Sequence, residues 1–160
     1  MEEIRNHFGV YGTCIKNNKL LCINKNAGPY QNRYDLPGGS QQYGEGLTET
    51  LSREVLEETG HKLLKYTNNR IYDSFVHEIG KAYTVHHIFA LYDIVLDILE
   101  NPLPNIVADG KNDSNGLIWV PINEISLKNS SPLVIKVKDE TLKKGEYMIS
   151  SVYKNWKVIK

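Results

Sequence analysis

The sequence has 160 residues, a length that suits one compact domain with its own hydrophobic core. Hydrophobic residues make up 41% of the chain and charged residues 24%, as in ordinary soluble globular proteins. Lysine plus arginine equals aspartate plus glutamate, 19 each, so the formal net charge is zero. That balance argues against a general binder of nucleic acid polymers or acidic membranes, which needs a basic excess. We therefore expect a single domain over residues 1–160.

The compartment is suggested by the cysteines and the N-terminus. Cys14 and Cys22 lie in adjacent predicted strands, where a disulfide is conceivable, but two cysteines in a chain of this length favour buried thiols in a reducing compartment. The first five residues are charged and lack the apolar core of a signal peptide. The apolar runs are too short to span a bilayer. We expect a cytoplasmic protein.

The first half of the chain predicts a hairpin, a short strand and a helix. Asn17 and Asn18 suit the hairpin turn because asparagine tolerates positive φ. The helix contains no proline, and Gly60 is a natural C-terminal stop. The expected ranges are strands over 8–16, 19–24 and 33–36 and a helix over 46–59.

The second half is mainly β-forming. We expect strands over 63–79, with an irregularity near Asn68, and over 82–99. Prolines, glycines and Asn/Asp residues indicate a loop over 100–116, before a strand over 117–120 and a turn or helix opened by Pro121. Residues 132–142 suit a C-terminal helix, although their Val-Ile-Lys-Val run suits a strand equally well. Strands alternating with one or two helices predict an α/β fold with a mixed sheet.

The predicted helix places acidic residues beside its apolar side. At 100° per residue, Leu47, Leu51 and Val55 form an apolar stripe, and Glu54 and Glu58 lie along that stripe or at its edge. Carboxylates one turn apart beside a buried face repel each other and lose solvation. A bound Mg²⁺ would compensate, since it prefers oxygen ligands and bridges carboxylates to phosphates. From the helix alone, a metal site and a charged helix edge explain the pattern equally well.

The segment before the helix ends in Leu36-Pro-Gly-Gly39. Two glycines let a backbone pass close to a ligand, but they also serve a plain strand-to-helix turn, which the segment alone favours.

The segment from Gly39 to His61 closely resembles the Nudix box. That signature has a glycine, five residues, a glutamate, seven residues, then Arg-Glu, an aliphatic residue, any residue, Glu-Glu, any residue, a glycine and an aliphatic residue. Its fixed positions are met here by Gly39, Glu45, Arg53, Glu54, Val55, Glu57, Glu58 and Gly60. His61 departs from the pattern, where an aliphatic residue is usual, and we expect a local packing change there. Looser resemblance extends over residues 10–120.

The resemblance implies a Nudix fold, a mixed β-sheet sandwiched between helices, with a loop-helix-loop catalytic motif. It also implies roles for the matching residues. Glu54, Glu57 and Glu58 would bind Mg²⁺, or Mn²⁺ in its place, with Glu54 sometimes the base that activates water. Arg53 would orient the glutamates, and Glu45 would bind metal or fix the loop. The expected catalytic residues are Arg53, Glu54 and Glu57, the metal site adds Glu58 and the Gly38 carbonyl, and Gly39 and Glu45 are expected to bind substrate.

For several other residues the sequence supports both a binding role and a purely structural role. Arg33 precedes the glycine loop and suits a phosphate as well as it suits the surface. His77, His86 and His87 suggest a metal site, but His86 and His87 are neighbours in a strand and point to opposite faces, so they cannot form one site without a bulge. We expect one of these two to be packed and the other to face a cleft. Several aromatic residues could stack a base or belong to the core: Tyr30, Tyr34, Tyr72, Phe75 and Tyr83. Asp109 and Asp113 lie where relatives place an additional acidic residue.

The resemblance implies Mg²⁺-dependent cleavage of the pyrophosphate link in a nucleoside diphosphate derivative. We favour nucleoside triphosphates, oxidised or otherwise non-standard ones included, over ADP-ribose or another nucleotide sugar. The proline that marks ADP-ribose-specific relatives about fifteen residues past the box is missing, since none occurs between Pro37 and Pro102. The alternative of a non-catalytic ligand sensor is less favoured because the box glutamates are intact. The expected partner is a small nucleotide, bound by a monomer or homodimer.

Overall fold

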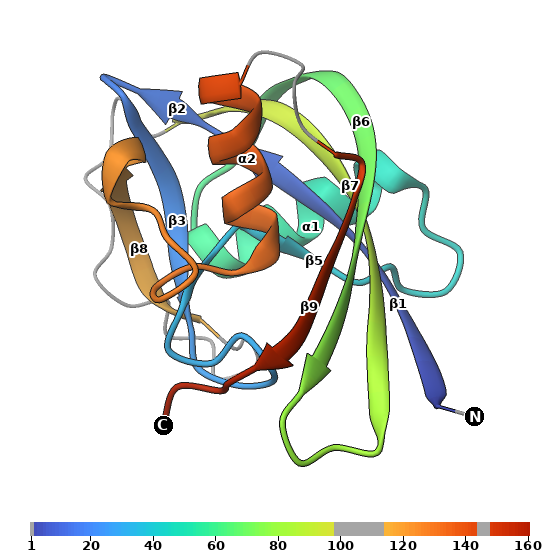
Figure 1. Cartoon of the computed structure of the whole chain (residues 1–160). Helices are drawn as coiled ribbons and strands as arrows, with labels where there is room; N and C mark the ends of the chain where they lie inside the picture. Colours follow the sequence, from blue (N-terminus) through green and yellow to red (C-terminus); the bar gives the residue numbers. More distant parts are fainter. Residues whose placement is uncertain (1, 98–113, 144–147) are drawn as a thin grey trace.

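The computed structural model describes residues 2–97, 114–143 and 148–160. Both termini lie at the same end of the molecule, beside the turn that joins the strands β6 (Leu63–Glu78) and β7 (Tyr83–Leu96) (Figure 1).

A five-stranded mixed sheet forms the larger layer. Its strand order is β5, β1, β7, β6 and β9. The pairs β1–β7 and β6–β9 are parallel, whereas β1–β5 and β6–β7 are antiparallel. The bounds are β1 Glu3–Thr13, β5 Gly38–Gly39, β6 Leu63–Glu78, β7 Tyr83–Leu96 and β9 Ser150–Trp156.

A second sheet is antiparallel and is built around β3. It contains β2 (Ile15–Lys16), β3 (Lys19–Lys25), β4 (Tyr34–Asp35) and β8 (Ser114–Pro121). Strand β3 pairs with each of the other three. The sequence predicts β3, β4 and β8, but it places β2 in one continuous strand over 8–16, whereas the structure breaks that strand at Cys14 and puts β1 and β2 in different sheets. The division into two sheets is not predicted, because pairing partners depend on tertiary contacts.

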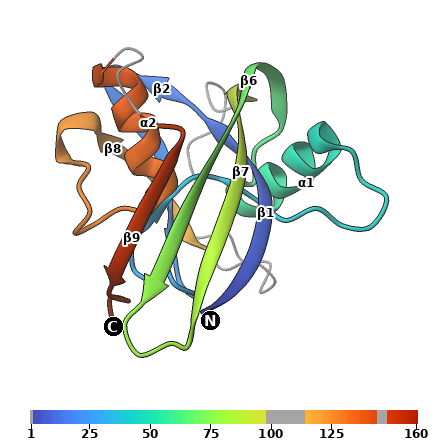
Figure 2. The same ribbon diagram turned by 45° about the vertical axis from the view of Figure 1, so that its right-hand side comes forward.

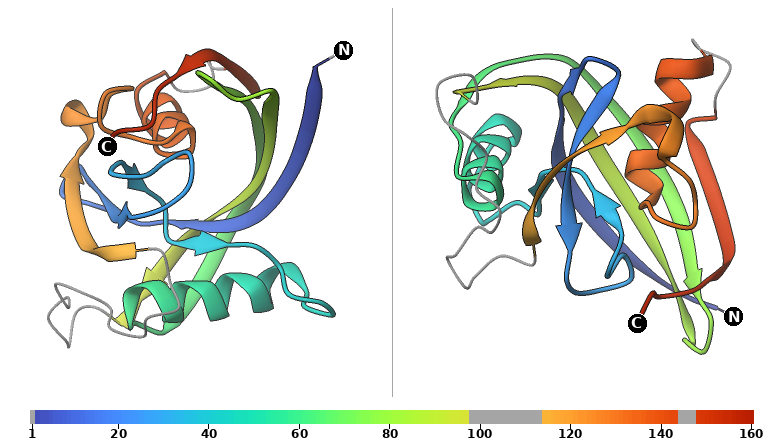
Figure 3. Two further views of the ribbon diagram at one scale, coloured as in Figure 1. Left: turned by 90° about the horizontal axis from the view of Figure 1, so that it is seen from below. Right: turned by 90° about the vertical axis from the view of Figure 1, so that its left-hand side faces the viewer.

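Two helices lie on opposite sides of the five-stranded sheet (Figure 2 and the right panel of Figure 3). Helix α1 (Leu47–Thr59) covers one face, where Leu51 and Val55 pack with Val10 of β1 and Ala90 of β7. Helix α2 (Pro132–Lys143) lies on the other side, against a core that includes Tyr11 and Phe89 and the inner residues of the second sheet. Successive strand residues therefore serve the two cores alternately. The expected α/β arrangement, a mixed sheet between helices, is confirmed.

Local predictions hold where local chemistry decides the structure. Asn17 and Asn18 have φ of 50° and 62° and form the β2–β3 turn. Asn68, with φ of 53°, stands at the irregularity in β6. Cys14 and Cys22 are buried, free thiols.

In the second half of the chain one prediction needs correction, one open alternative is settled and one strand was missed. Strand β8 begins at Ser114, inside the range expected to be a loop; residues 98–113 lie outside the described part of the chain. The ambiguous segment from Pro132 is a helix and not a strand. Strand β9 was not predicted, because its sequence, Ser-Ser-Val-Tyr-Lys-Asn-Trp, carries a weak apolar pattern and is stabilised by pairing with β6. A short 3₁₀ helix, Ile122–Glu124, follows Pro121 as expected.

Candidate active site

Helix α1 carries the acidic residues that the sequence analysis singled out. Leu51 and Val55 are fully buried, and Glu58 beside them is only 2% exposed, as the predicted stripe requires. Leu47 does not complete the stripe; it is 37% exposed because it lies in the first turn, at the edge of the packed surface. The helix ends at Gly60, which has φ of 71° and donates its N–H to the carbonyl of Leu56.

The N-terminal end of α1 is organised by Glu45. Its Oε1 accepts hydrogen bonds from the Gln42 N–H, at 2.7 Å, and from the Thr50 hydroxyl, at 3.2 Å. A negative charge at this end is also favoured by the helix dipole. Glu45 therefore closes the loop onto the first turn of the helix, in agreement with the loop-fixing role considered from the sequence.

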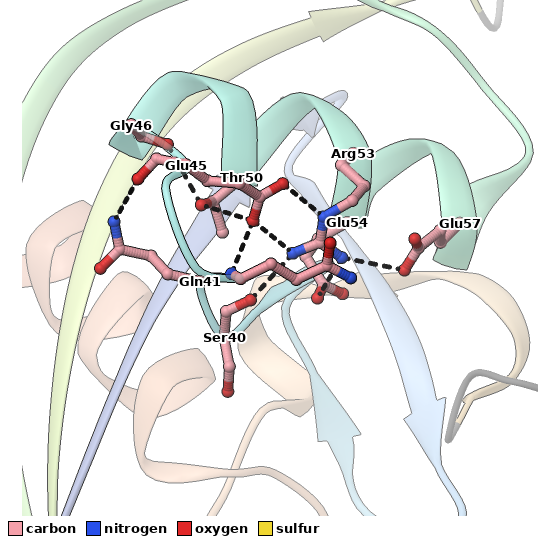
Figure 4. A network of polar contacts seen from close by, with 9 residues as sticks. Ser40, Gln41, Glu45, Gly46, Thr50, Arg53, Glu54 and Glu57 are labelled. Atoms are coloured by element: carbon pink, nitrogen blue, oxygen red, sulfur yellow. Dashed lines mark hydrogen bonds and ion pairs between the residues drawn. The ribbon is translucent and has the colours of Figure 1, made fainter.

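Arg53 is the centre of a network of carboxylates (Figure 4). Its Nε and Nη2 bind the two oxygens of Glu45 at 2.6 and 2.8 Å, a bidentate pair. Its Nη1 donates to Glu54 at 2.8 Å and to Glu57 at 3.2 Å, and Nη2 also reaches the carbonyl of Ser40 at 2.9 Å. One guanidinium thus holds three glutamates and the loop before the helix.

The network shifts pKa values in opposite directions. The hydrogen bond from Arg53 is the main cause that lowers the pKa of Glu45 to about 2. Burial raises the pKa of Glu54, although Arg53 beside it acts in the opposite sense. At Glu54 the effect of partial burial therefore exceeds that of the ion pair with Arg53.

The two glycines before the helix are required by close contacts with the glutamates. The Gly38 N–H donates to Oε2 of Glu58 at 3.0 Å. A side chain at Gly38 is excluded because its φ is 144° and a Cβ would lie 2.2 Å from the Val10 carbonyl. A Cβ on Gly39 would lie 2.7 Å from the Glu54 carboxyl carbon. The glycine pair therefore brings the loop backbone against Glu54 and Glu58.

The donor set fits a divalent cation that is bound partly by substrate. Among residues 2–97, 114–143 and 148–160, no three His, Cys, Asp or Glu side chains form a ready metal cage. One carboxylate oxygen of Glu54 and one of Glu57 accept hydrogen bonds from Arg53 in this arrangement. Mg²⁺ does not need a full protein cage, since it keeps several waters and is commonly bound by one or two carboxylates plus substrate phosphates. The half-buried Glu54 carboxyl is a suitable ligand.

The side chain of Arg33 contacts other parts of the chain than the glutamates of α1. It is 6% exposed, so the expectation of a surface arginine is wrong. Its guanidinium donates to the carbonyls of Leu127 and, at 2.8 Å, Lys157, and lies 4.2 Å from the centre of the Trp156 ring. These contacts anchor the C-terminal segment. They do not support the expected phosphate-binding role.

The histidines occupy separate places, as expected for neighbours in a strand. His87 is 3% exposed and hydrogen-bonded to two tyrosines. His86 points to the other face, pairs with Asp73 at 2.7 Å and stacks on Phe75. The packed histidine, His87, is the one that lines a cavity.

His61, the departure from the box pattern, is buried and tied to the end of β7. Its Nδ1 lies 3.0 Å from Oδ1 of Asp97, which also accepts the Lys62 N–H at 3.0 Å. The local change expected there is therefore a polar contact between the end of α1 and the residue that follows β7. Among the described residues, none is a hydrogen-bond partner of Nε2 of His61.

Sequence reasoning missed Lys25 and Tyr11, which line the same cavity as His87 and the aromatic candidates Tyr30 and Tyr83. No local signal marks them, because the cavity is assembled when β1 pairs with β7, some 80 positions later in the chain. Asp109 and Asp113 lie outside the described residues, so their expected contribution to the site stays a prediction. Of the aromatic candidates, Tyr72 belongs to the buried core and Tyr34 packs against it.

Comparison with known proteins agrees with this geometry. The sequence matches the family model described as NUDIX domain over residues 5–140. None of the helices in the described part of the chain combines the length and apolar character that crossing a bilayer requires.

Individual proteins are similar to this chain either over part of its sequence or in fold. The chain is 41% identical over 51 residues to the ADP-ribose pyrophosphatase of Methanocaldococcus jannaschii, a match that covers 32% of this chain and 30% of that protein. The fold is similar to that of a MutT Nudix hydrolase from Burkholderia pseudomallei, with a TM-score of 0.62, 17% identity and coverage of 86% and 98% of the two chains. A Nudix hydrolase from Nitrosomonas europaea gives a TM-score of 0.59, 22% identity and coverage of 90% and 98%.

Proposed function

Because this chain belongs to the Nudix family, hydrolases that act on pyrophosphate bonds, we propose that it cleaves the pyrophosphate link of a nucleoside diphosphate derivative with Mg²⁺ as cofactor. The observation that carries this proposal is the acidic side of α1. Glu58 lies against Gly38 and Glu54 against Gly39, and partial burial raises the pKa of the Glu54 carboxyl despite its ion pair with Arg53, so a bound cation would stabilise its charged form. Family members generally use divalent metals, and Mn²⁺ would suit the same oxygen ligands.

Glu54, Glu57 and Glu58 would hold the cation, with the Gly38 carbonyl as a further candidate. A bound cation neutralises the diphosphate and activates water, so it supplies the main electrostatic stabilisation of the transition state. Glu54 would accept a proton from the attacking water, since burial raises its pKa toward the range useful for a base. Arg53 keeps the glutamates in place and links them to Glu45.

Two substrate classes are in competition. We favour a nucleoside triphosphate, because the proline typical of ADP-ribose-specific relatives is missing. ADP-ribose is the second candidate, favoured by the identity to the ADP-ribose pyrophosphatase, although that match covers less than a third of that protein.

A substrate screen tests the proposal. The protein is incubated with Mg²⁺ and a panel of nucleoside triphosphates, oxidised nucleotides, ADP-ribose and UDP-sugars, and the released pyrophosphate, phosphate and nucleoside monophosphate are measured. Metal-dependent release of pyrophosphate from triphosphates supports the favoured class, and release of AMP from ADP-ribose supports the second. The absence of hydrolysis across the panel, with a protein shown to be folded, contradicts the proposal.

A further inference from the structure

The first half of strand β1 leaves one backbone edge of the five-stranded sheet open. Within residues 2–97, 114–143 and 148–160, β1 pairs with β7 from Glu3 to Thr13, but it pairs with β5 only at Val10 and Tyr11. The part of β1 before Val10 therefore forms the margin of the sheet, at the end far from α1 (Figure 3, left panel). A strand with one open side presents N–H and C=O groups that another strand can bind.

The backbone groups on this open side belong to alternate residues of β1. The Gly12 N–H donates to the Pro37 carbonyl, which lies on the β5 side of β1, away from β7. The pairing of β1 with β7 runs without a register shift. In a parallel pair, successive residues direct their N–H and C=O groups alternately to one side of the strand and to the other. By this alternation Ile4, Asn6 and Phe8 present their backbone groups to the open side.

Glu3 and Arg5 carry opposite charges on one face of this margin. Their side chains share a face because they are two positions apart, and Nε of Arg5 lies 2.6 Å from Oε1 of Glu3. More than half of each side chain is exposed. Ile4 between them points to the other face and is 49% exposed. When two such strands meet antiparallel about a two-fold axis at Ile4, each Glu3 lies opposite Arg5 of the other copy.

This register satisfies the backbone and the side chains together. Because Ile4 faces the open side, the two Ile4 residues exchange two N–H···O bonds. Glu3 and Arg5 of the other copy then form a non-hydrogen-bonded pair, in which side chains are closest and opposite charges stabilise. An axis at Arg5 would place two guanidinium groups opposite each other, and an axis at Glu3 two carboxylates. An axis at Asn6 would leave Arg5 without a carboxylate opposite it.

We propose that two copies of this chain associate through the open edge of β1, as antiparallel strands over residues 2–6 with the two-fold axis at Ile4. The five-stranded sheets of the two copies then form one continuous sheet. Strand β5 does not block this pairing, because it occupies the edge only at Val10 and Tyr11, beyond the paired segment. A second copy is the expected partner because the charges along this edge complement themselves. The inference does not use the glutamates of α1 and is independent of the proposed function.

The paired segment is short, so the association should be weak. Stable interfaces bury about 1,200–2,000 Å² in total, and five residues from each copy cover less. We expect an equilibrium between monomer and dimer with a Kd between about 10 μM and 1 mM. Sedimentation equilibrium over protein concentrations from about 5 μM to 1 mM measures this Kd.

Charge reversal tests the pairing and its register. Arg5→Glu places carboxylates opposite each other, and Glu3→Arg does the same with guanidinium groups, so each should raise the Kd of the dimer about tenfold or more. Lys65→Glu makes the same change of charge as Arg5→Glu at an exposed position of β6 and should dimerise as wild type does. Melting curves of all variants confirm that each is folded.

Mixing two reversed variants provides a sharper test. A pair made of Glu3→Arg and Arg5→Glu has opposite charges at both contacts, so fluorescently labelled Glu3→Arg should bind unlabelled Arg5→Glu about as tightly as wild type binds itself. Titration of the same labelled protein with Lys65→Glu is the control. That titrant has the same net charge as Arg5→Glu but leaves two arginines opposite each other at one contact, so it should bind more weakly.

A backbone substitution tests the hydrogen bonds of the edge. Ile4→Pro removes an N–H that faces the open side and does not serve the pairing with β7, so it should abolish the dimer. Ile4→Val keeps this N–H and a β-branched side chain, and it should dimerise as wild type does.

The outcomes separate the parts of the inference. A wild-type protein that stays monomeric up to about 1 mM overturns the association. Labelled Glu3→Arg that binds Arg5→Glu no better than it binds Lys65→Glu overturns the register, and an Ile4→Pro protein that dimerises as Ile4→Val does overturns the backbone pairing. These measurements use no substrate, so a protein that hydrolyses no pyrophosphate bond would contradict the proposed function alone.

Discussion

The guanidinium of Arg53 binds both carboxylate oxygens of Glu45, at 2.6 and 2.8 Å. The two residues are eight positions apart, on the loop before α1 and on the helix itself. The same guanidinium reaches Glu54 and Glu57. The pair therefore connects the loop that approaches the site to the glutamates proposed to bind metal, and the arrangement can be tested residue by residue.

Glu45→Gln should remove the part of the free energy of unfolding that comes from the ionised Glu45 carboxylate, a part that wild type loses in acid. Because Arg53 lowers the pKa of Glu45 from an ordinary value of 4.5 to about 2, this contribution is complete above pH 4.5 and is lost as the pH falls through about 2. Denaturant unfolding between these pH values should show a smaller pH dependence in Glu45→Gln than in wild type. Glu49→Gln, at an exposed position of the same helix, is the control and should follow wild type.

Gly39→Ala should impair the site without unfolding the protein. The added methyl would lie 2.7 Å from the Glu54 carboxyl carbon, and the flexible glutamate side chain moves more easily than the backbone. We expect weaker Mg²⁺ activation, measured as a higher metal concentration at half-maximal rate. Gly46→Ala is the control, since its methyl meets only a Glu49 oxygen at 3.5 Å. Equal metal dependence in Gly39→Ala and wild type would show that the position of Glu54 does not matter.

Two substitutions of Glu58 should separate the effect of its charge on stability from the effect of its hydrogen bond to Gly38. Without metal, Glu58→Gln removes one charge from the carboxylate cluster and keeps an oxygen for the Gly38 N–H, so it should melt at or above wild type and gain less from Mg²⁺. Glu58→Ala leaves that N–H unpaired in a buried position and should lose about 1–3 kcal/mol. Thermal melting with chelator and with millimolar Mg²⁺ measures both. A metal-free Glu58→Gln protein that melts well below wild type would make Glu58 a structural partner first.

The rate of hydrolysis should favour neutral to alkaline pH. Glu54 must be ionised to bind metal or to accept a proton, and burial raises its pKa, so activity is lost on the acid side at a higher pH than for an ordinary glutamate. A profile of kcat/KM against pH provides the measurement. An optimum near about pH 5 contradicts a base of this kind.

Local patterns in the sequence predict much of the fold. Helix α1 and its stop at Gly60, the Asn17-Asn18 turn and the irregularity at Asn68 follow from side-chain chemistry within a few residues. Strand β9 and the parallel pairing of β1 with β7 do not, because they depend on partners distant in the chain.

The candidate site divides in the same way. The spacing of the box residues predicts that Arg53 lies among the glutamates. The position of Arg33 is not predictable in this way, because it contacts Trp156 and Lys157, which are more than a hundred positions away in the chain. The cavity around His87 likewise exists only after β1, β7 and the loop beyond β3 have come together.

The most direct test of the central claim is the turnover of Glu54→Gln beside that of Glu49→Gln, measured with the best nucleotide substrate across a Mg²⁺ titration and with chelator. The two glutamates lie on the same helix, but Glu54 contacts Arg53 and the Gly39 backbone, whereas Glu49 is exposed. We predict that wild type and Glu49→Gln require Mg²⁺ and are equally active, while Glu54→Gln loses about 10²-fold or more in kcat. Hydrolysis that persists with chelator, or a Glu54→Gln protein as active as Glu49→Gln, would contradict the account.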